Sequence, residues 1–170
     1  RGPGVHGGHP THPELARSAG VSGCTGCNFT DAAQVTVEAG KLKVAFTDFG
    51  VQARSPRLER STCLFSIAAQ WPAGQQIVIR NVKLKGSYAV SSGKAVATAE
   101  LFTTGGIGQS VQAQATSGSG RFREVEPNEV YRSNCSGSGL LRLNSSVRLT
   151  GSGAMKLDRL SAELSLESCP

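Results

Sequence analysis

Residues 141–149 read Leu-Arg-Leu-Asn-Ser-Ser-Val-Arg-Leu, and this stretch decides the fold class. Apolar side chains and one serine occupy the odd positions, whereas polar side chains occupy positions 142, 144, 146 and 148. Successive side chains of a β-strand point to opposite faces, so this alternation predicts a long strand with one buried face and one wet face.

The same alternation recurs along most of the chain. Val35 to Phe46 predicts a hairpin with its turn at Ala39-Gly40, and the apolar parity changes at Arg80-Asn81, which predicts a β-bulge. Residues 54–61 are polar and predict a loop. Further strands are expected within 63–70, 77–90, 95–102, 111–115, 155–157 and 160–166. With no helical pattern in the chain, the sequence predicts an all-β protein, an antiparallel β-sandwich of about nine short strands.

The first 23 residues differ from the rest in composition. They are rich in Gly, Pro and His and show no apolar periodicity, so we predict an irregular N-terminal tail at 1–23 and a disulfide-stabilised β-sandwich domain at 24–170. The tail is a candidate subunit-contact arm that would add a strand to a neighbour's sheet edge in a homo-oligomer or a self-assembling extracellular structure. The chain starts at Arg1 rather than Met, as a mature chain does after signal removal. No apolar run is long enough for a transmembrane segment.

Five cysteines predict the compartment: Cys24, Cys27, Cys63, Cys135 and Cys169. Zinc would need a second close pair or nearby histidines, and all three histidines lie in the tail. Structural disulfides are therefore expected, and they imply a secreted protein, extracellular or at the cell surface. One cysteine of five has no partner within the chain, and Cys24, which borders the tail, is the expected odd one.

The net charge indicates an acidic partner. The chain has 18 Lys and Arg against 12 Asp and Glu, a net charge of +6, and a pI near 9.4 makes it a basic protein. The densest cations alternate with Leu or Val, as on the wet face of a strand, and form the candidate anion-binding set Lys41, Lys43, Arg80, Lys83 and Lys85. Aromatic residues make up 5% of the chain, which argues against nucleic acid as the partner, because base stacking needs more of them.

Catalysis has little support in the sequence. Residues 24–170 contain no histidine, which excludes a His-activated nucleophile or a His-ligated metal there. A carboxylate hydrolase needs two acidic side chains in one cleft. The candidates for such a pair are Asp48, Glu100, Glu124, Glu126, Glu129, Asp158 and Glu163. The sequence pairs no two of these, so we predict a protein that is not an enzyme and has no cofactor.

Three weaker motifs remain. His6, His9 and His12 recur at intervals of three and are weak candidates for metal binding, although no metal site is predicted. Asn28 and Asn144 fit the glycosylation sequon. No EF-hand spacing supports calcium binding by the loop carboxylates.

A set of landmarks in fixed order resembles a known family. The landmarks are Gly26-Cys27, Leu42 to Phe46, Cys63, Pro72-Ala73-Gly74, Val82 to Gly86, Asn134 to Gly137, Leu143-Asn144, Asp158 and Cys169. Over residues 26–169 this order resembles a domain-of-unknown-function family of secreted four-cysteine proteins of fungi and bacteria. The resemblance implies that Cys27, Cys63, Cys135 and Cys169 are the disulfide cysteines and that Cys24 is extra. The chain departs from the family pattern at Asn28, where the family has proline, and the family carries no catalytic motif.

Three functions follow as hypotheses. The first is a secreted non-catalytic β-sandwich that acts as an extracellular structural or interaction protein, with 1–23 as its contact arm. The second is a binding module for anionic glycans or other acidic surfaces, through the cations named above. The third is a carboxylate-based secreted hydrolase.

Overall fold

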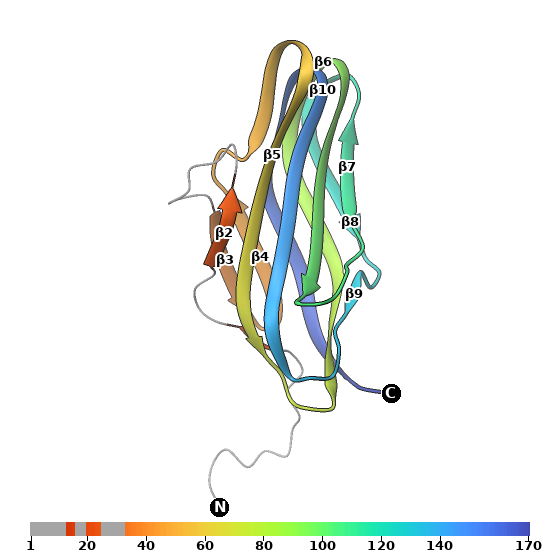
Figure 1. The fold of residues 1–170 in the computed structure, drawn as a ribbon. Helices are drawn as coiled ribbons and strands as arrows, with labels where there is room; N and C mark the ends of the chain where they lie inside the picture. The colour runs from red at the N-terminus through yellow and green to blue at the C-terminus, as the bar shows by residue number, and fades with distance from the viewer. Residues whose placement is uncertain (1–12, 16–19, 25–32) are drawn as a thin grey trace, which may run out of the picture.

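The structure is a computed structural model that describes residues 13–15, 20–24 and 33–170 (Figure 1). Its described residues form ten antiparallel strands and no helix, which confirms the predicted all-β antiparallel sandwich. The strands are β1 (Glu14–Leu15), β2 (Gly20–Cys24), β3 (Ala33–Glu38), β4 (Lys41–Phe46), β5 (Gly50–Gln70), β6 (Gln75–Thr103), β7 (Val111–Ala115), β8 (Gly118–Glu126), β9 (Tyr131–Arg132) and β10 (Ser138–Ser168). In these ranges no helix could cross a membrane.

Three strands are far longer than the sequence predicts. β5, β6 and β10 contain 21, 29 and 31 residues. Each runs along the molecule, bends at one end and returns, so that the first half of β10 lies in front of its second half (Figure 1). Gly93 of β6 lies directly opposite Gly151 of β10 at this bend. Their φ angles of +79° and +134° are ones that glycine adopts without strain, so the bend does not break the strands.

The polar stretch 54–61, predicted as a loop, is part of β5, so that prediction is wrong. Residues 54–58 are exposed at successive positions, because this part of β5 lies at the bend and has no core on either side. The residues there are polar because both faces of the strand are exposed to solvent. A sequence pattern does not distinguish such a strand from a loop.

The bend divides the sheet into two layers. The β5 layer consists of residues 57–70 of β5, 138–151 of β10, 94–103 of β6, and β7. The β4 layer consists of β3, β4, residues 157–168 of β10, 75–86 of β6, β8 and β9. β10 is the middle strand of both layers, since it pairs with β5 and β6 in one and with β4 and β6 in the other.

The core lies between the layers. Phe46 of the β4 layer packs against Phe65 of the β5 layer, with ring centroids 6.0 Å apart. Thr103 and Tyr131, also from opposite layers, share a buried hydrogen bond of 2.5 Å. Leu, Ile, Val and Ala side chains from every long strand fill the space around them. Side chains of the other parity therefore face outward on each layer.

Two local predictions are confirmed. β3 and β4 form the expected hairpin, and its turn residues Ala39 and Gly40 have φ of 49° and 77°, as a two-residue hairpin turn requires. At Asn81 (φ 54°) the register between β6 and β10 shifts by one residue, which is the expected bulge.

Parts of the N-terminal segment join the chain's own sheet. β1 and β2 pair with β5, with Glu14 opposite Gln70 and Cys24 opposite Cys63. The outer edge of β5 therefore has partners from the same chain at residues 63–66 and 69–70.

Candidate anion-binding face

Four of the five predicted cations project outward from the β4 layer. In β4, Leu42 and Val44 are buried while Lys41 and Lys43 are exposed. In β6, Val82 and Leu84 are buried, so Lys83 and Lys85 take the outward positions. Strand alternation thus places both lysine pairs on one surface.

Strand register brings the two pairs together. Ser161 of β10 lies opposite Lys43 on one side and opposite Lys83 on the other. Two residues away on β10, at the next outward position, Arg159 lies opposite Lys85. Because neighbouring strands are about 4.8 Å apart, the backbones of Lys43 and Lys83 are about 10 Å apart, within the joint reach of their side chains.

We call Lys41, Lys43, Lys83, Lys85 and Arg159 the cationic face. Arg159 was not among the predicted cations. Its signal was its place on the outward parity of the strand that carries buried Leu160, Ala162 and Leu164. The sequence pattern does not show which strands lie beside Arg159, because that depends on pairing between distant segments of the chain.

The cationic face surrounds a surface hollow of about 420 Å³. Its lining is Gln34, Thr36, Lys41, Lys43, Val44, Ala45, Lys83, Lys85, Arg159, Leu160 and Ser161. No carboxylate and no aromatic ring is in that lining. Charge and hydrogen-bonding groups, rather than ring stacking, therefore dominate what the hollow offers a ligand.

A second hollow of about 640 Å³ adjoins the first and shares Thr36, Lys41 and Lys43 with it. Here the charge is mixed, because Glu38, Glu163 and Arg80 also contribute. Glu163 accepts a hydrogen bond of 2.9 Å from the Asn81 side chain. The net positive charge is therefore concentrated in the smaller hollow.

The cations of the face lack acidic partners. Among the described residues, no carboxylate lies within 4 Å of Lys41, Lys43, Lys83, Lys85 or Arg159, although Glu38 and Glu163 flank Lys41 in the register. The other four cations have no carboxylate opposite them, and together around one hollow they create a positive potential that attracts anions.

Arg80, the fifth predicted anion-binding residue, forms ion pairs outside the cationic face. It contacts Glu167 at 2.8 Å and Glu129 at 3.6 Å. Arg132 binds the same two carboxylates, at 2.7 Å to Glu129 and 3.0 Å to Glu167. Hydrogen bonds from Arg80 and Arg132 lower the pKa of the Glu167 carboxyl, and those to Glu129 and Glu167 raise the pKa of Arg132.

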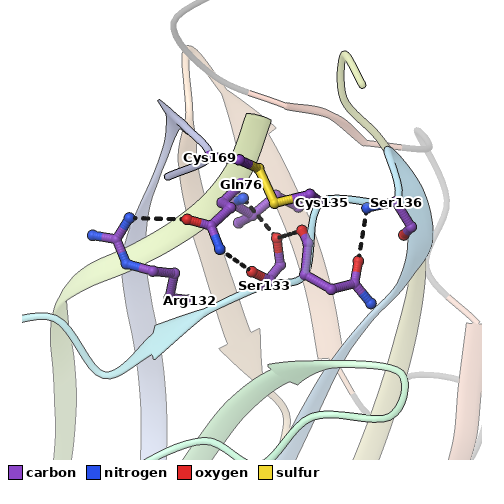
Figure 2. The surroundings of a disulfide bond; sticks show 8 residues. Gln76, Arg132, Ser133, Cys135, Ser136 and Cys169 are labelled. Carbon is purple, nitrogen blue, oxygen red and sulfur yellow. Dashed lines mark hydrogen bonds between the residues drawn. A yellow bond between two sulfur atoms is a disulfide. The ribbon is translucent and has the colours of Figure 1, made fainter. Parts of the chain in front are cut away.

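This ion network continues to a disulfide at the end of the sandwich (Figure 2). Arg132 donates to the Gln76 side chain, and Gln76 donates to the Ser133 carbonyl at 2.8 Å. Cys135, just beyond, forms a disulfide with Cys169. The bond joins the segment after β9 to the end of β10, so it closes the open end of the β4 layer.

The remaining predicted residues are scattered. Cys63 also forms a disulfide. Cys24 lies in β2, and Cys27, Asn28, His6, His9 and His12 lie outside the described residues. Asn144 is exposed on the outer surface of the β5 layer.

Three of the acidic side chains considered for hydrolysis have partners other than a second carboxylate. Asp48 contacts Lys156 at 3.2 Å, Asp158 contacts Arg121 at 3.8 Å, and Glu100 accepts from the Gly108 amide. The carboxylates that share a hollow, Glu38 and Glu163, share it with cations. No group of three His, Cys, Asp or Glu side chains in the described ranges is placed to hold a metal ion.

Fold and surface together define a disulfide-bonded, all-β sandwich protein with a cationic outer face. The chain belongs to the family described as a domain of unknown function, DUF4360, whose sequence profile matches residues 16–168. No curated protein matches its sequence.

Comparison with solved structures gives remote similarities. The enzymatically active domain of bacteriophage CBA120 tailspike protein 4 is 12% identical, with a TM-score of 0.32, over 93% of this chain and 19% of that one. TmCBM61 in complex with beta-1,4-galactotriose is 12% identical, with a TM-score of 0.25, over 98% and 95%. A family 11 carbohydrate-binding module from Clostridium thermocellum is 10% identical, with a TM-score of 0.23, over 97% and 92%. Similarities at this level carry no argument about function, and this chain spans about a fifth of the tailspike domain.

Proposed function

We propose that this protein is a secreted, non-catalytic binding module for anionic glycans, which it holds on the cationic face. The observation that supports this proposal is the convergence of five cations, four of them without a carboxylate opposite, on a hollow of about 420 Å³. A surface that keeps like charges together without neutralising them is suited to a ligand that supplies the opposite charge.

The lining of the hollow favours a glycan over other polyanions. Gln34, Thr36 and Ser161 offer amide and hydroxyl groups beside the cations, and these groups can hydrogen-bond to sugar hydroxyls. Aromatic side chains, on which nucleic-acid bases would stack, are not part of the lining. Secretion is supported by the Cys135–Cys169 disulfide, because such bonds persist in oxidising compartments.

The test is retention on an immobilised sulfated polysaccharide, with uncharged dextran as the comparison matrix. The variant Lys43→Gln/Lys83→Gln removes the two lysines that flank Ser161. A cation held against a dense anionic surface contributes about 1 kcal/mol, so we expect binding to weaken about 30-fold and elution to move to lower salt.

Arg54→Gln/Arg142→Gln is the matched control, because it removes the same charge from exposed positions outside the cationic face. It should elute close to the native protein. Equal losses in the two variants would show that only net charge matters, and failure of the native protein to bind would remove the proposal.

A further inference from the structure

We propose that Arg60, Arg148 and Lys94 form a second anion-binding site on the opposite side of the sandwich, so that one molecule joins two anionic glycan chains. The second site has a geometry of its own. The joining of two chains also rests on the proposed function of the cationic face.

The second site is built on two arginines that lie directly opposite each other. Arg60 of β5 is the register partner of Arg148 of β10, and both side chains are exposed. Like charges directly opposite across two strands destabilise a sheet. Lys94 of β6 adds a third exposed cation, because it lies opposite Thr150, two residues beyond Arg148.

Nearby carboxylates leave these cations unneutralised. Glu59 is paired with Arg57 at 2.7 Å. Glu100, on the same outer surface, lies opposite Asn144, four residues from Arg148, and accepts from the Gly108 amide. In the described part of the chain, no carboxylate is within 4 Å of Arg60, Arg148 or Lys94.

The chemistry of the site suits sulfate or carboxylate groups on a glycan. Two guanidinium groups side by side present planar forks of N–H donors, which match the paired oxygens of these anions. Beside them, Ser146, Thr98 and Gln112 form one register row on the outer surface of the layer and offer neutral hydrogen-bonding groups. The site therefore repeats the combination found on the cationic face.

The two sites face in opposite directions. Val147 and Leu149 are buried in the core from the β5 layer, and Leu160 is buried in the core from the β4 layer. Arg148 and Arg159, both on β10, therefore point away from each other on opposite outer surfaces, because the strand bends between them (Figure 1). A straight glycan bound at one site does not reach the other, so two occupied sites mean two chains.

Calorimetric titration with a short sulfated oligosaccharide, too short to span both faces, counts the sites. We expect two oligosaccharides per native molecule. We expect one for Arg60→Gln/Arg148→Gln and one for Lys43→Gln/Lys83→Gln, whereas Arg54→Gln/Arg142→Gln should keep two. Unchanged thermal unfolding would show that each variant is folded.

Each failure has its own signature. One site in the native protein that only Lys43→Gln/Lys83→Gln removes would overturn the second site and leave the proposed function standing. One site that only Arg60→Gln/Arg148→Gln removes would overturn the proposed function and the joining of chains. No binding would overturn both.

Long polymer provides the second measurement. Mixing native protein with a long sulfated polysaccharide should raise light scattering, and excess polymer should reverse the rise, because each molecule then holds one chain at each site without sharing. Arg60→Gln/Arg148→Gln should bind the polymer without that rise. An equal rise for this variant would contradict the joining of two chains.

Discussion

Arg80 of β6 donates a hydrogen bond of 2.8 Å to Glu167 of β10, and this pair joins the two strands at the open end of the β4 layer. Arg132 contacts the same carboxylate at 3.0 Å. Both bonds lower the pKa of Glu167, so its ionised form is bound more tightly in the folded chain than in the unfolded one.

The first prediction concerns acid stability. A carboxyl whose pKa is lower in the folded chain stabilises the fold above its unfolded pKa, and the stabilisation is lost as the pH falls through the folded value. The thermal midpoint of Glu167→Gln should therefore fall less on acidification than that of the native protein. Glu38→Gln, which also removes one carboxylate but one that has no ion pair among the described residues, is the matched control. Identical curves for Glu167→Gln and native protein would contradict the assignment.

The second prediction concerns the disulfide. Cys135 and Cys169 are 34 residues apart, and a bond across such a loop restricts the unfolded chain. The chain-entropy treatment gives a contribution of about 3.8 kcal/mol for this length. Cys135→Ser/Cys169→Ser should lower the free energy of unfolding by roughly that amount in a urea titration. A loss below about 1 kcal/mol would mean that hydrogen bonds alone, such as Cys169 N–H to Gly74 O at 2.8 Å, hold this end.

The third prediction concerns the β3–β4 turn. Ala39 has φ of 49°, a left-handed conformation that costs alanine about 1 kcal/mol and that asparagine adopts more readily. Ala39→Asn should therefore stabilise the protein by about 0.5–1 kcal/mol in chemical denaturation. Ala73→Asn, in a turn residue that has negative φ, is the control and should give no such gain. Equal effects at both positions would exclude the turn as the cause.

The fourth prediction concerns the bend. A Cβ on Gly93 would collide with the Thr150 carbonyl of β10, and the residue also has φ of +79°. Gly105 has a similar φ of +86° but open space around it. Both substitutions to alanine carry the backbone cost of about 1 kcal/mol, and Gly93→Ala adds the collision. Thermal unfolding should show the larger loss for Gly93→Ala, and equal losses would contradict close packing at the bend.

Residue alternation predicted the local elements well. Leu42, Val44 and Phe46 face the core as their spacing indicated, and the parity change at Arg80-Asn81 is a bulge. Alternation did not predict that β10 continues through Gly151 and Gly153, because glycine also marks turns and only the opposing strand shows which role it takes.

The sequence predicted the individual lysine pairs of the candidate site but not that the two pairs lie side by side. Lys41 and Lys43 belong to one strand, Lys83 and Lys85 to another, and each pair was evident from spacing. Their convergence across Ser161 depends on register between segments far apart in the chain, as does the opposition of Arg60 and Arg148. Arg80 has the same spacing pattern as the lysines. It differs from them because it forms an ion pair with Glu167, which belongs to a distant part of the sequence.

The position of β10 in both layers has a consequence for biogenesis. The hairpins β3–β4 and β6–β7 are complete once their own residues have been made, but β5 and β6 must wait for Ser138–Ser168 to fill the space between them. Until then both keep an unpaired edge and an uncovered apolar side, which are features that promote aggregation. Synthesis that stops within β10 therefore leaves neither layer of the sandwich closed.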